Sequence, residues 1–178
     1  MVICMYGAGS DLIDQKYKDV VEELGREIAK RNHELIYGGG GSGLMGAVAK
    51  GTHLAGGKVT GVVPHFMHEF EPIYEYTSYN IKTTTMGERK QIMEDNSDGF
   101  VICPGGIGTL DEFFQILTLK ELKRQEKPIV LLNIDGFYDP VVDLIENYIQ
   151  KGFIREKVRG LYGVASTPEE AINYLEGK

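Results

Sequence analysis

The sequence predicts an α/β fold in which a parallel sheet is covered by helices on both faces. Short, wholly apolar runs alternate with longer segments in which apolar residues recur every three or four positions. Strands that are apolar on both faces need cover on both, and helices between successive strands supply it. The 178 residues are 42% hydrophobic and 25% charged, a balance that suits one domain spanning residues 1–178.

Local signals place these elements along the chain. Strands are expected at residues 2–6, 35–37, 59–63, 99–103 and 129–132. Helices are expected at about residues 17–31, 47–55, 85–95, 110–123 and 140–151. A last helix should begin after Thr167, because the run Thr167-Pro168-Glu169-Glu170 combines a capping threonine, a proline at N1 and a glutamate at N3. Residues 65–78 have no clear periodicity, so a loop with short elements is expected there.

Composition excludes several classes of partner. The formal net charge of −7 argues against nucleic acid as the main partner. The N-terminus lacks the pattern of a signal sequence, and no apolar run approaches the roughly 20 residues that cross a bilayer. We therefore expect a cytoplasmic protein with no membrane partner. Cys4 and Cys103 fall in apolar strands, which predicts reduced core thiols rather than metal ligands.

The most specific segment of the chain is a glycine-rich turn between a predicted strand and a predicted helix. It reads Pro104-Gly105-Gly106-Ile107-Gly108-Thr109. Glycines let the backbone approach a ligand, and the first N–H groups of the following helix point outward, so the turn predicts a phosphate cradle. Glu112 would then lie beside a bound anion that repels it, which suggests chemistry rather than affinity. The alternative is a capping box, in which Thr109 and Glu112 satisfy each other's backbone donors.

A second glycine-rich loop, residues 38–46, satisfies the G-x-G-x-x-G pattern twice. A dinucleotide site is nevertheless not expected, because the loop follows the second strand and the next strand has no acidic residue at its tip. The chain also lacks the G-x-x-x-x-G-K-[ST] pattern of P-loop NTPases. The structural alternative for this loop is a turn that allows close helix–sheet packing.

The third feature is an arginine on an apolar helix face. In a helix over residues 85–95, Arg89 shares a face with Met86, Ile92 and Met93. A buried guanidinium without a partner is costly, so Arg89 predicts either a bound anion or an internal salt bridge.

Taken in order, these segments resemble the signature motifs of the Lonely Guy (LOG) family. The matching residues read GGGxxGLMG at 38–46, MxxRK at 86–90 and PGGxGTxxE at 104–112, and weaker similarity extends the resemblance over nearly the whole chain. Members of the family are cytokinin-activating nucleoside 5′-monophosphate phosphoribohydrolases. The resemblance implies a Rossmann-like fold and hydrolysis of the N-glycosidic bond of a purine nucleotide, with no metal and no cofactor.

The resemblance also implies roles for individual residues. Arg89 and Glu112 match the catalytic pair. The implied substrate-binding residues are Gly39, Gly40, Glu71, Arg89, Lys90, Gly105, Gly106, Ile107, Gly108 and Thr109. Glu69 is close enough in sequence to be the glutamate assigned here to Glu71. Cleavage of a glycosidic bond builds positive charge on the ribose, which a carboxylate stabilises, so the chemistry fits the carried-over roles.

One departure from the family and one alternative function remain. Family members commonly have Thr-Trp-x-Gln-Leu-Gly after the catalytic glutamate, whereas this chain has TLKELK at 118–123 and no tryptophan. The resemblance implies a homodimer or higher homo-oligomer, and the apolar residues surrounding much of the helix at 110–123 agree with it. The alternative is a non-catalytic carrier of a nucleotide or of the molybdenum cofactor with the same fold, and the presence of both Arg89 and Glu112 speaks against it.

Overall fold

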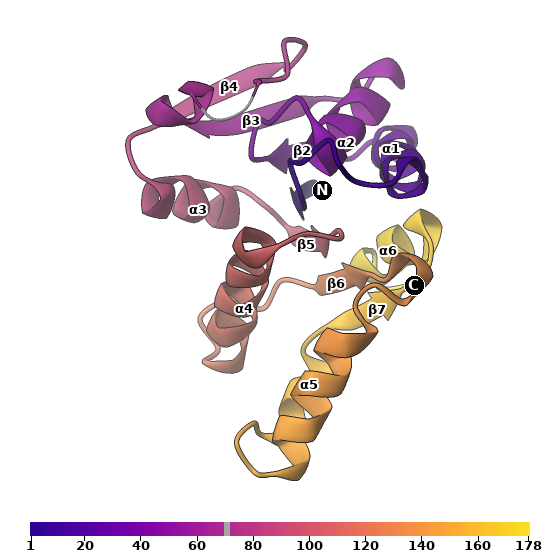
Figure 1. The fold of residues 1–178 in the computed structure, drawn as a ribbon, viewed down its shortest axis with the longest axis vertical. Helices are drawn as coiled ribbons and strands as arrows, with labels where there is room; N and C mark the ends of the chain where they lie inside the picture. Colours follow the sequence, from indigo (N-terminus) through magenta and orange to yellow (C-terminus); the bar gives the residue numbers. More distant parts are fainter. Residues whose placement is uncertain (70–71) are drawn as a thin grey trace.

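A seven-stranded parallel sheet forms the centre of the computed structural model, which describes residues 1–69 and 72–178. Its strands are β1 (Val2–Tyr6), β2 (Glu34–Tyr37), β3 (Val59–Pro64), β4 (Tyr79–Thr83), β5 (Gly99–Ile102), β6 (Ile129–Leu132) and β7 (Gly163–Ala165). Their order is β4-β3-β2-β1-β5-β6-β7, and every neighbouring pair is parallel (Figure 1). The expected Rossmann-like α/β fold is confirmed.

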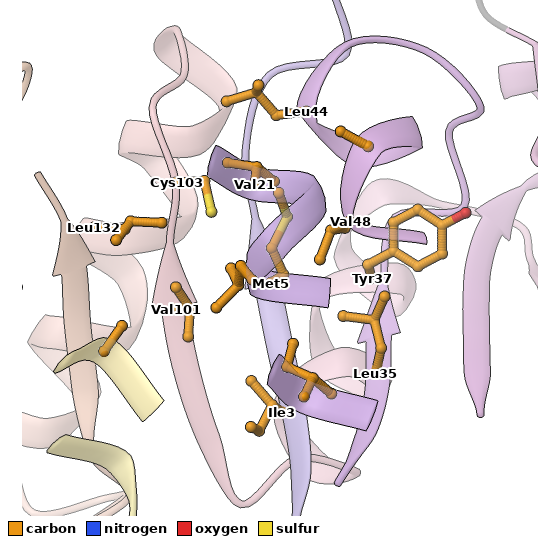
Figure 2. Close-up of a cluster of buried hydrophobic side chains, with 14 of the residues drawn as sticks. Ile3, Met5, Val21, Leu35, Tyr37, Leu44, Val48, Val101, Cys103 and Leu132 are labelled. Carbon is orange, nitrogen blue, oxygen red and sulfur yellow. The ribbon is translucent and has the colours of Figure 1, made fainter. Parts of the chain in front are cut away.

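Helices cover both faces of this sheet. They are α1 (Gln15–Lys30), α2 (Gly43–Leu54), α3 (Met86–Asp95), α4 (Ile107–Glu121), α5 (Asp139–Gln150) and α6 (Pro168–Leu175), with short 3₁₀ segments at His65–Glu69 (η1), Ile134–Gly136 (η2) and Glu156–Gly160 (η3). Helices α1, α2 and α6 pack on the face that carries Ile3 and Met5, part of which Figure 2 shows. Helices α3, α4 and α5 pack on the face that carries Tyr6 and Phe100. Among the described residues, no helix is both long enough and apolar enough to cross a bilayer.

Two strands were missing from the sequence prediction. Strand β4 is mostly exposed, and β7 has only three residues, so neither contains an apolar run. Both lie at the edges of the sheet, where one side of a strand has no neighbour to bury it. In the segment predicted to be a loop, η1 and an isolated bridge between Gly40 and Ile73 are the short elements observed in the described residues.

Helix α4 begins earlier than predicted, and this corrects the capping-box alternative. Its N-cap is Gly106, which makes no side-chain capping bond, so Thr109 lies inside the first turn. The first backbone bond of the helix runs from the Leu110 N–H to the Gly106 carbonyl, at 3.0 Å. The N–H groups of Ile107, Gly108 and Thr109 precede that bond and point out of the helix end. Because glycine replaces a side-chain cap, these donors stay available to a ligand.

Helices α1 and α2 approach each other backbone to backbone. A Cβ atom built on Gly25 of α1 would lie 2.3 Å from the Val48 carbonyl oxygen. A Cβ atom on Gly51 of α2 would lie 2.0 Å from the Glu22 carbonyl oxygen. Both distances are well inside van der Waals contact, so the absence of side chains sets the spacing of the pair.

The first prediction concerns this contact. In an exposed helix Gly→Ala is stabilising, but Gly51→Ala is expected to lower the free energy of unfolding by about 2–3 kcal/mol, because the two backbones must separate. Urea denaturation measures the change. Gly87→Ala in α3 is the control, since its Cβ would meet only the Thr85 Oγ1 at 3.8 Å. Equal stability of the two variants would contradict the proposed packing constraint.

Candidate active site

The strand order reverses between β1 and β5, and a cavity of about 300 Å³ opens at that point. The loops after these two strands run to opposite sides of the sheet there, which is where open α/β sheets bind ligands. The volume lies at the small end of the range for small-molecule sites, roughly 300–1,000 Å³. The turn at residues 7–10 and the glycine-rich segments at 38–46 and 104–109 follow β1, β2 and β5 of one parallel sheet, and so lie at the same edge.

Arg89 is held at the wall of this cavity by backbone carbonyls. Its side chain is 6% exposed, its Nε donates to the Val62 carbonyl oxygen at 3.2 Å, and its Nη2 donates to the Gly38 carbonyl oxygen at 3.3 Å. Among the described residues no carboxylate lies within 4 Å of the guanidinium, so the internal salt bridge considered from the sequence is not found there. The carbonyls satisfy the hydrogen bonds of the guanidinium, but no carboxylate among the described residues contacts it, which suits an anionic ligand.

Gly38 is the reason the guanidinium fits. A Cβ atom at this position would lie 1.7 Å from the Arg89 Nη2. Residue 38 therefore has to lack a side chain for Arg89 to reach the carbonyl that orients it.

Glu112 lines the same cavity from α4. Burial raises the pKa of its carboxyl from 4.5 to about 7, while the charges of Arg89 and Lys90 pull it down. A carboxylate with a pKa near neutrality is poorly solvated and can exchange a proton during a reaction near pH 7.

The second prediction follows from this pKa. A carboxyl whose folded pKa lies above its unfolded value destabilises the fold once it ionises, so the penalty is absent below pH 4.5 and complete above pH 7. Glu112→Gln is therefore expected to raise the free energy of unfolding by up to about 3 kcal/mol at pH 8 and to change little at pH 4.

Denaturant titrations at both pH values measure this difference. Glu126→Gln, at an exposed carboxyl, is the control and should show no such pH-dependent gain. A Glu112→Gln variant that is no more stable than the wild type at pH 8 would show that the carboxylate is well solvated.

Lys90 supports the site from outside the cavity lining. Its Nζ donates to the Asp111 Oδ2 at 2.9 Å, which joins α3 to the first turns of α4. Its positive charge also acts on the neighbouring Glu112, whose pKa it lowers. Lys90 therefore influences Glu112 through its charge and through its contact with α4.

Three of the five residues of the expected phosphate turn line the cavity. They are Gly106, Gly108 and Thr109. Gly105 lines a neighbouring cavity. A Cβ atom at Gly105 would lie 2.1 Å from the Oγ1 of the buried Thr109, so the glycine makes room for that side chain. The Ile107 side chain is 87% exposed and points away, so this residue can contribute only its backbone to a ligand.

The second glycine-rich loop is largely occupied by internal contacts. At the start of α2 the Gly43 N–H donates to the Asp11 Oδ1 at 3.0 Å, and the Leu44 N–H donates to the Ala8 carbonyl oxygen at 2.8 Å. Gly39 has a φ of +81°, and a Cβ there would lie 2.2 Å from the Val63 Cγ2. Gly38 and Met45 line the cavity, whereas Gly39 and Gly40 do not. These contacts favour the close-packing interpretation for most of the loop.

Other cavity residues had no functional signal in the sequence. The turn after β1, residues 7–10, was recognised only as a strand end, and Met67 belongs to the aperiodic segment. Glu71 lies outside the described residues, so its predicted substrate contact has no structural counterpart here. Among the described residues, no three His, Cys, Asp or Glu side chains come together as metal ligands.

Comparison with known proteins agrees with this architecture. Residues 45–175 match a family model described as "Possible lysine decarboxylase". The chain is 37% identical to LOGL2 of Oryza sativa subsp. japonica over 98% of its length and 71% of the relative's. It is 38% identical to LOG of the same plant, covering 98% and 72%, and 35% identical to LOG3 of Arabidopsis thaliana, covering 98% and 81%. All three are named cytokinin riboside 5′-monophosphate phosphoribohydrolases, the first as probable.

Solved structures with the same fold carry other names. The molybdenum cofactor binding protein of the phototrophic bacterium Rippkaea orientalis has a TM-score of 0.76 at 24% identity, with 99% of this chain and 95% of that one covered. The molybdenum cofactor carrier protein of Chlamydomonas reinhardtii has a TM-score of 0.73 at 25% identity, with 99% and 96% covered. Both enzymes and carriers therefore use this architecture.

Proposed function

The chain belongs to the Lonely Guy family of phosphoribohydrolases, which are hydrolases acting on N-glycosyl bonds, and we propose that it cleaves purine nucleoside 5′-monophosphates to free base and ribose 5-phosphate. One observation carries the proposal. The uncapped N-terminus of α4, the buried Arg89 and the high-pKa Glu112 line a single cavity. A non-catalytic carrier has no need of a desolvated carboxylate beside an anion site.

The phosphate is assigned to the N-terminus of α4. The outward N–H groups of its first turn and the helix dipole favour a dianion there. Glu112 lies one turn further along the same helix, so a phosphate in the cradle places the ribose next to its carboxylate. The phosphate also raises the pKa of Glu112, and the positive charge of Arg89 opposes that effect.

The chemistry follows from this placement. As the bond between C1′ and the base nitrogen breaks, its electron pair leaves with the base and C1′ becomes positively charged. The ionised Glu112 stabilises this charge and accepts a proton from the attacking water, whose oxygen bonds to C1′. The departing base takes up one proton and Glu112 gives up the one that it accepted, so the free base and ribose 5-phosphate leave the enzyme in its starting state. Arg89 holds the anionic groups in position by charge-assisted hydrogen bonds.

The test is incubation of the protein with AMP and with isopentenyl-AMP, followed by chromatography for free base. Adenine or isopentenyladenine should appear together with an equal amount of ribose 5-phosphate. Calorimetry of the same mixtures measures nucleotide binding. Binding without release of base would favour the carrier alternative, which the structural resemblance to molybdenum cofactor proteins supports.

We also propose that the working unit is at least a homodimer formed through α4. The buried side of this helix carries Phe113, Ile116 and Leu117, while Phe114 and Leu122 are 36% and 62% exposed. Leu119, at the position where the family commonly has tryptophan, lines a surface cavity of about 370 Å³ next to α3. A second copy could bury this apolar surface across a two-fold axis.

The third prediction tests the interface. Leu119→Asp is expected to weaken assembly and to lower activity with it, because Glu112 is on the same helix. Sedimentation velocity at assay concentration measures the first effect, and base release measures the second. Leu144→Asp, at a leucine of α5 that is 44% exposed, is the control and should leave both unchanged. A fully active monomer would refute the dimer.

A further inference from the structure

The phosphate turn, residues 104–109, has a cavity on each side. On the side of α3 and α4 lies the candidate active site, which Gly106, Gly108 and Thr109 line. On the side of α1 lies a second, apolar cavity of about 200 Å³, whose lining includes Gly106 again and Tyr17 of α1. A Cβ atom built on Gly106 would meet no other part of the described chain within 4 Å. Packing therefore does little to fix the position of the turn.

Hydrogen bonds to two consecutive carbonyl groups hold the start of the turn. The Ala8 N–H donates to the Pro104 carbonyl oxygen at 3.1 Å. The Tyr138 Oη donates to the Cys103 carbonyl oxygen at 2.6 Å. Burial raises the pKa of Tyr138, so this hydroxyl stays protonated and remains a donor at neutral pH. Of the four groups in these two bonds, the hydroxyl alone belongs to a side chain, so a substitution can remove it without changing the backbone.

The segment after β6 places Tyr138 at this carbonyl. The Asn133 Oδ1 accepts a hydrogen bond from the Tyr138 N–H at 2.7 Å, and the Asn133 Nδ2 donates to the Asp139 Oδ1 at 2.7 Å. Between them the backbone turns sharply, because Asp135 and Gly136 have φ values of +51° and +73°. The side chain of Tyr138 is fully buried. Its position is therefore fixed both by its own packing and by the turn that precedes α5.

We propose that Tyr138 is a positioning residue that holds the phosphate turn, through the Cys103 carbonyl, where the N–H groups of the turn meet the 5′-phosphate. The proposal rests on the proposed function. Tyr138 does not line the active-site cavity, so it acts on a nucleotide only through the turn. Without this hydroxyl the turn is free to shift toward the second cavity, and its N–H groups would then move away from the phosphate. Hydrogen bonds weaken steeply as their geometry worsens, so phosphate binding should suffer.

The alternative is a purely structural role, in which the bond only satisfies two buried polar groups. Its loss would then reduce the folded fraction of the protein and lower the rates with AMP and adenosine by the same factor. A positioning role affects only the substrate that carries a phosphate. The ratio of kcat/KM for AMP to kcat/KM for adenosine separates the two roles, because it does not depend on the concentration of folded enzyme.

The experiment is Tyr138→Phe in the full chain, which keeps the buried ring and removes only the hydroxyl. The value of kcat/KM for AMP should fall about tenfold, mainly through a higher KM, since misplacing a substrate by a fraction of an ångström has effects of this order. The value for adenosine should not change. Calorimetry should show a matching rise in the dissociation constant of AMP. If Tyr138→Phe fails to fold, Asn133→Ala removes the acceptor of the Tyr138 N–H and should lower the ratio in the same direction.

Tyr162→Phe is the matched control and should leave the ratio unchanged. The Tyr162 ring packs edge-on against Phe113, with 5.8 Å between ring centroids, and it lines neither of the two cavities. An unchanged ratio in Tyr138→Phe would overturn the proposal, and so would an equal fall in both variants, because the effect would then not be specific to the turn. Release of base from AMP by the wild-type protein tests the proposed function separately, and its absence would refute both.

Discussion

Glu112→Gln is expected to lower kcat for AMP by at least about a hundredfold, while nucleotide binding stays unchanged or becomes tighter. Glutamine keeps the size of the side chain but removes the negative charge that faces the ribosyl cation and the site that accepts the proton of water. It also removes repulsion between the carboxylate and the bound phosphate. Steady-state rates of base release give kcat, and calorimetry gives the dissociation constant.

The position of Glu112 makes this result interpretable. Gly106 caps α4, so Glu112 has no capping role that the substitution could disturb. The variant should therefore fold, and its loss of rate should reflect chemistry alone. In the wild-type protein, kcat/KM should rise with pH through about 7, since burial raises the pKa of Glu112 to that value and only the ionised form acts. Near-wild-type turnover by the glutamine variant would contradict the catalytic assignment.

Adenosine is expected to be hydrolysed at least about a thousandfold less efficiently than AMP, measured as kcat/KM. The phosphate contributes no reacting atom, but its binding to the α4 N-terminus positions the glycosidic bond at Glu112, and that binding energy is used in the transition state. Base release from both compounds under the same conditions gives the ratio.

Gly108→Ala offers a matched variant for this comparison. Gly108 lines the cavity, and a Cβ atom there meets no protein atom within 4 Å, so the fold should tolerate it. The added methyl would intrude on a phosphate at the helix end, and should therefore slow the hydrolysis of AMP while leaving the low rate with adenosine unaltered. Comparable rates for adenosine and AMP in the wild-type protein would mean that this turn does not bind the phosphate.

The sequence was most informative where one local signal decides the structure. Central strands such as Ile129–Leu132 are buried along their whole length, and their apolar runs predicted them correctly. Strand β4 lies at the edge of the sheet, pairs with β3 alone and is mostly exposed, so it has little apolar character and the pattern missed it. The start of α4 was misplaced because its N-cap is Gly106 and its first turn contains Gly108, and glycine has a low helix propensity.

The candidate site shows the same division. Motifs in the sequence singled out Glu112 and Arg89, but not how the guanidinium is held. Its partners are carbonyl groups of Gly38 and Val62, and these face it only once β2, β3 and α3 are assembled. Met67 had no signal in the sequence, since its place in the cavity lining depends on where the chain passes after β3 rather than on the residues around it.

The contact between Gly38 and Arg89 has a consequence for related sequences. The Arg89 guanidinium occupies the space that a side chain at residue 38 would need, so positions 38 and 89 are expected to change together in evolution. A homologue that acquires alanine or a larger residue at the position of Gly38 is therefore expected either to hold its arginine in another orientation or to lack it. A survey of the two positions in related sequences checks this, and frequent pairing of a side chain at position 38 with an arginine held by the same carbonyl groups would contradict it.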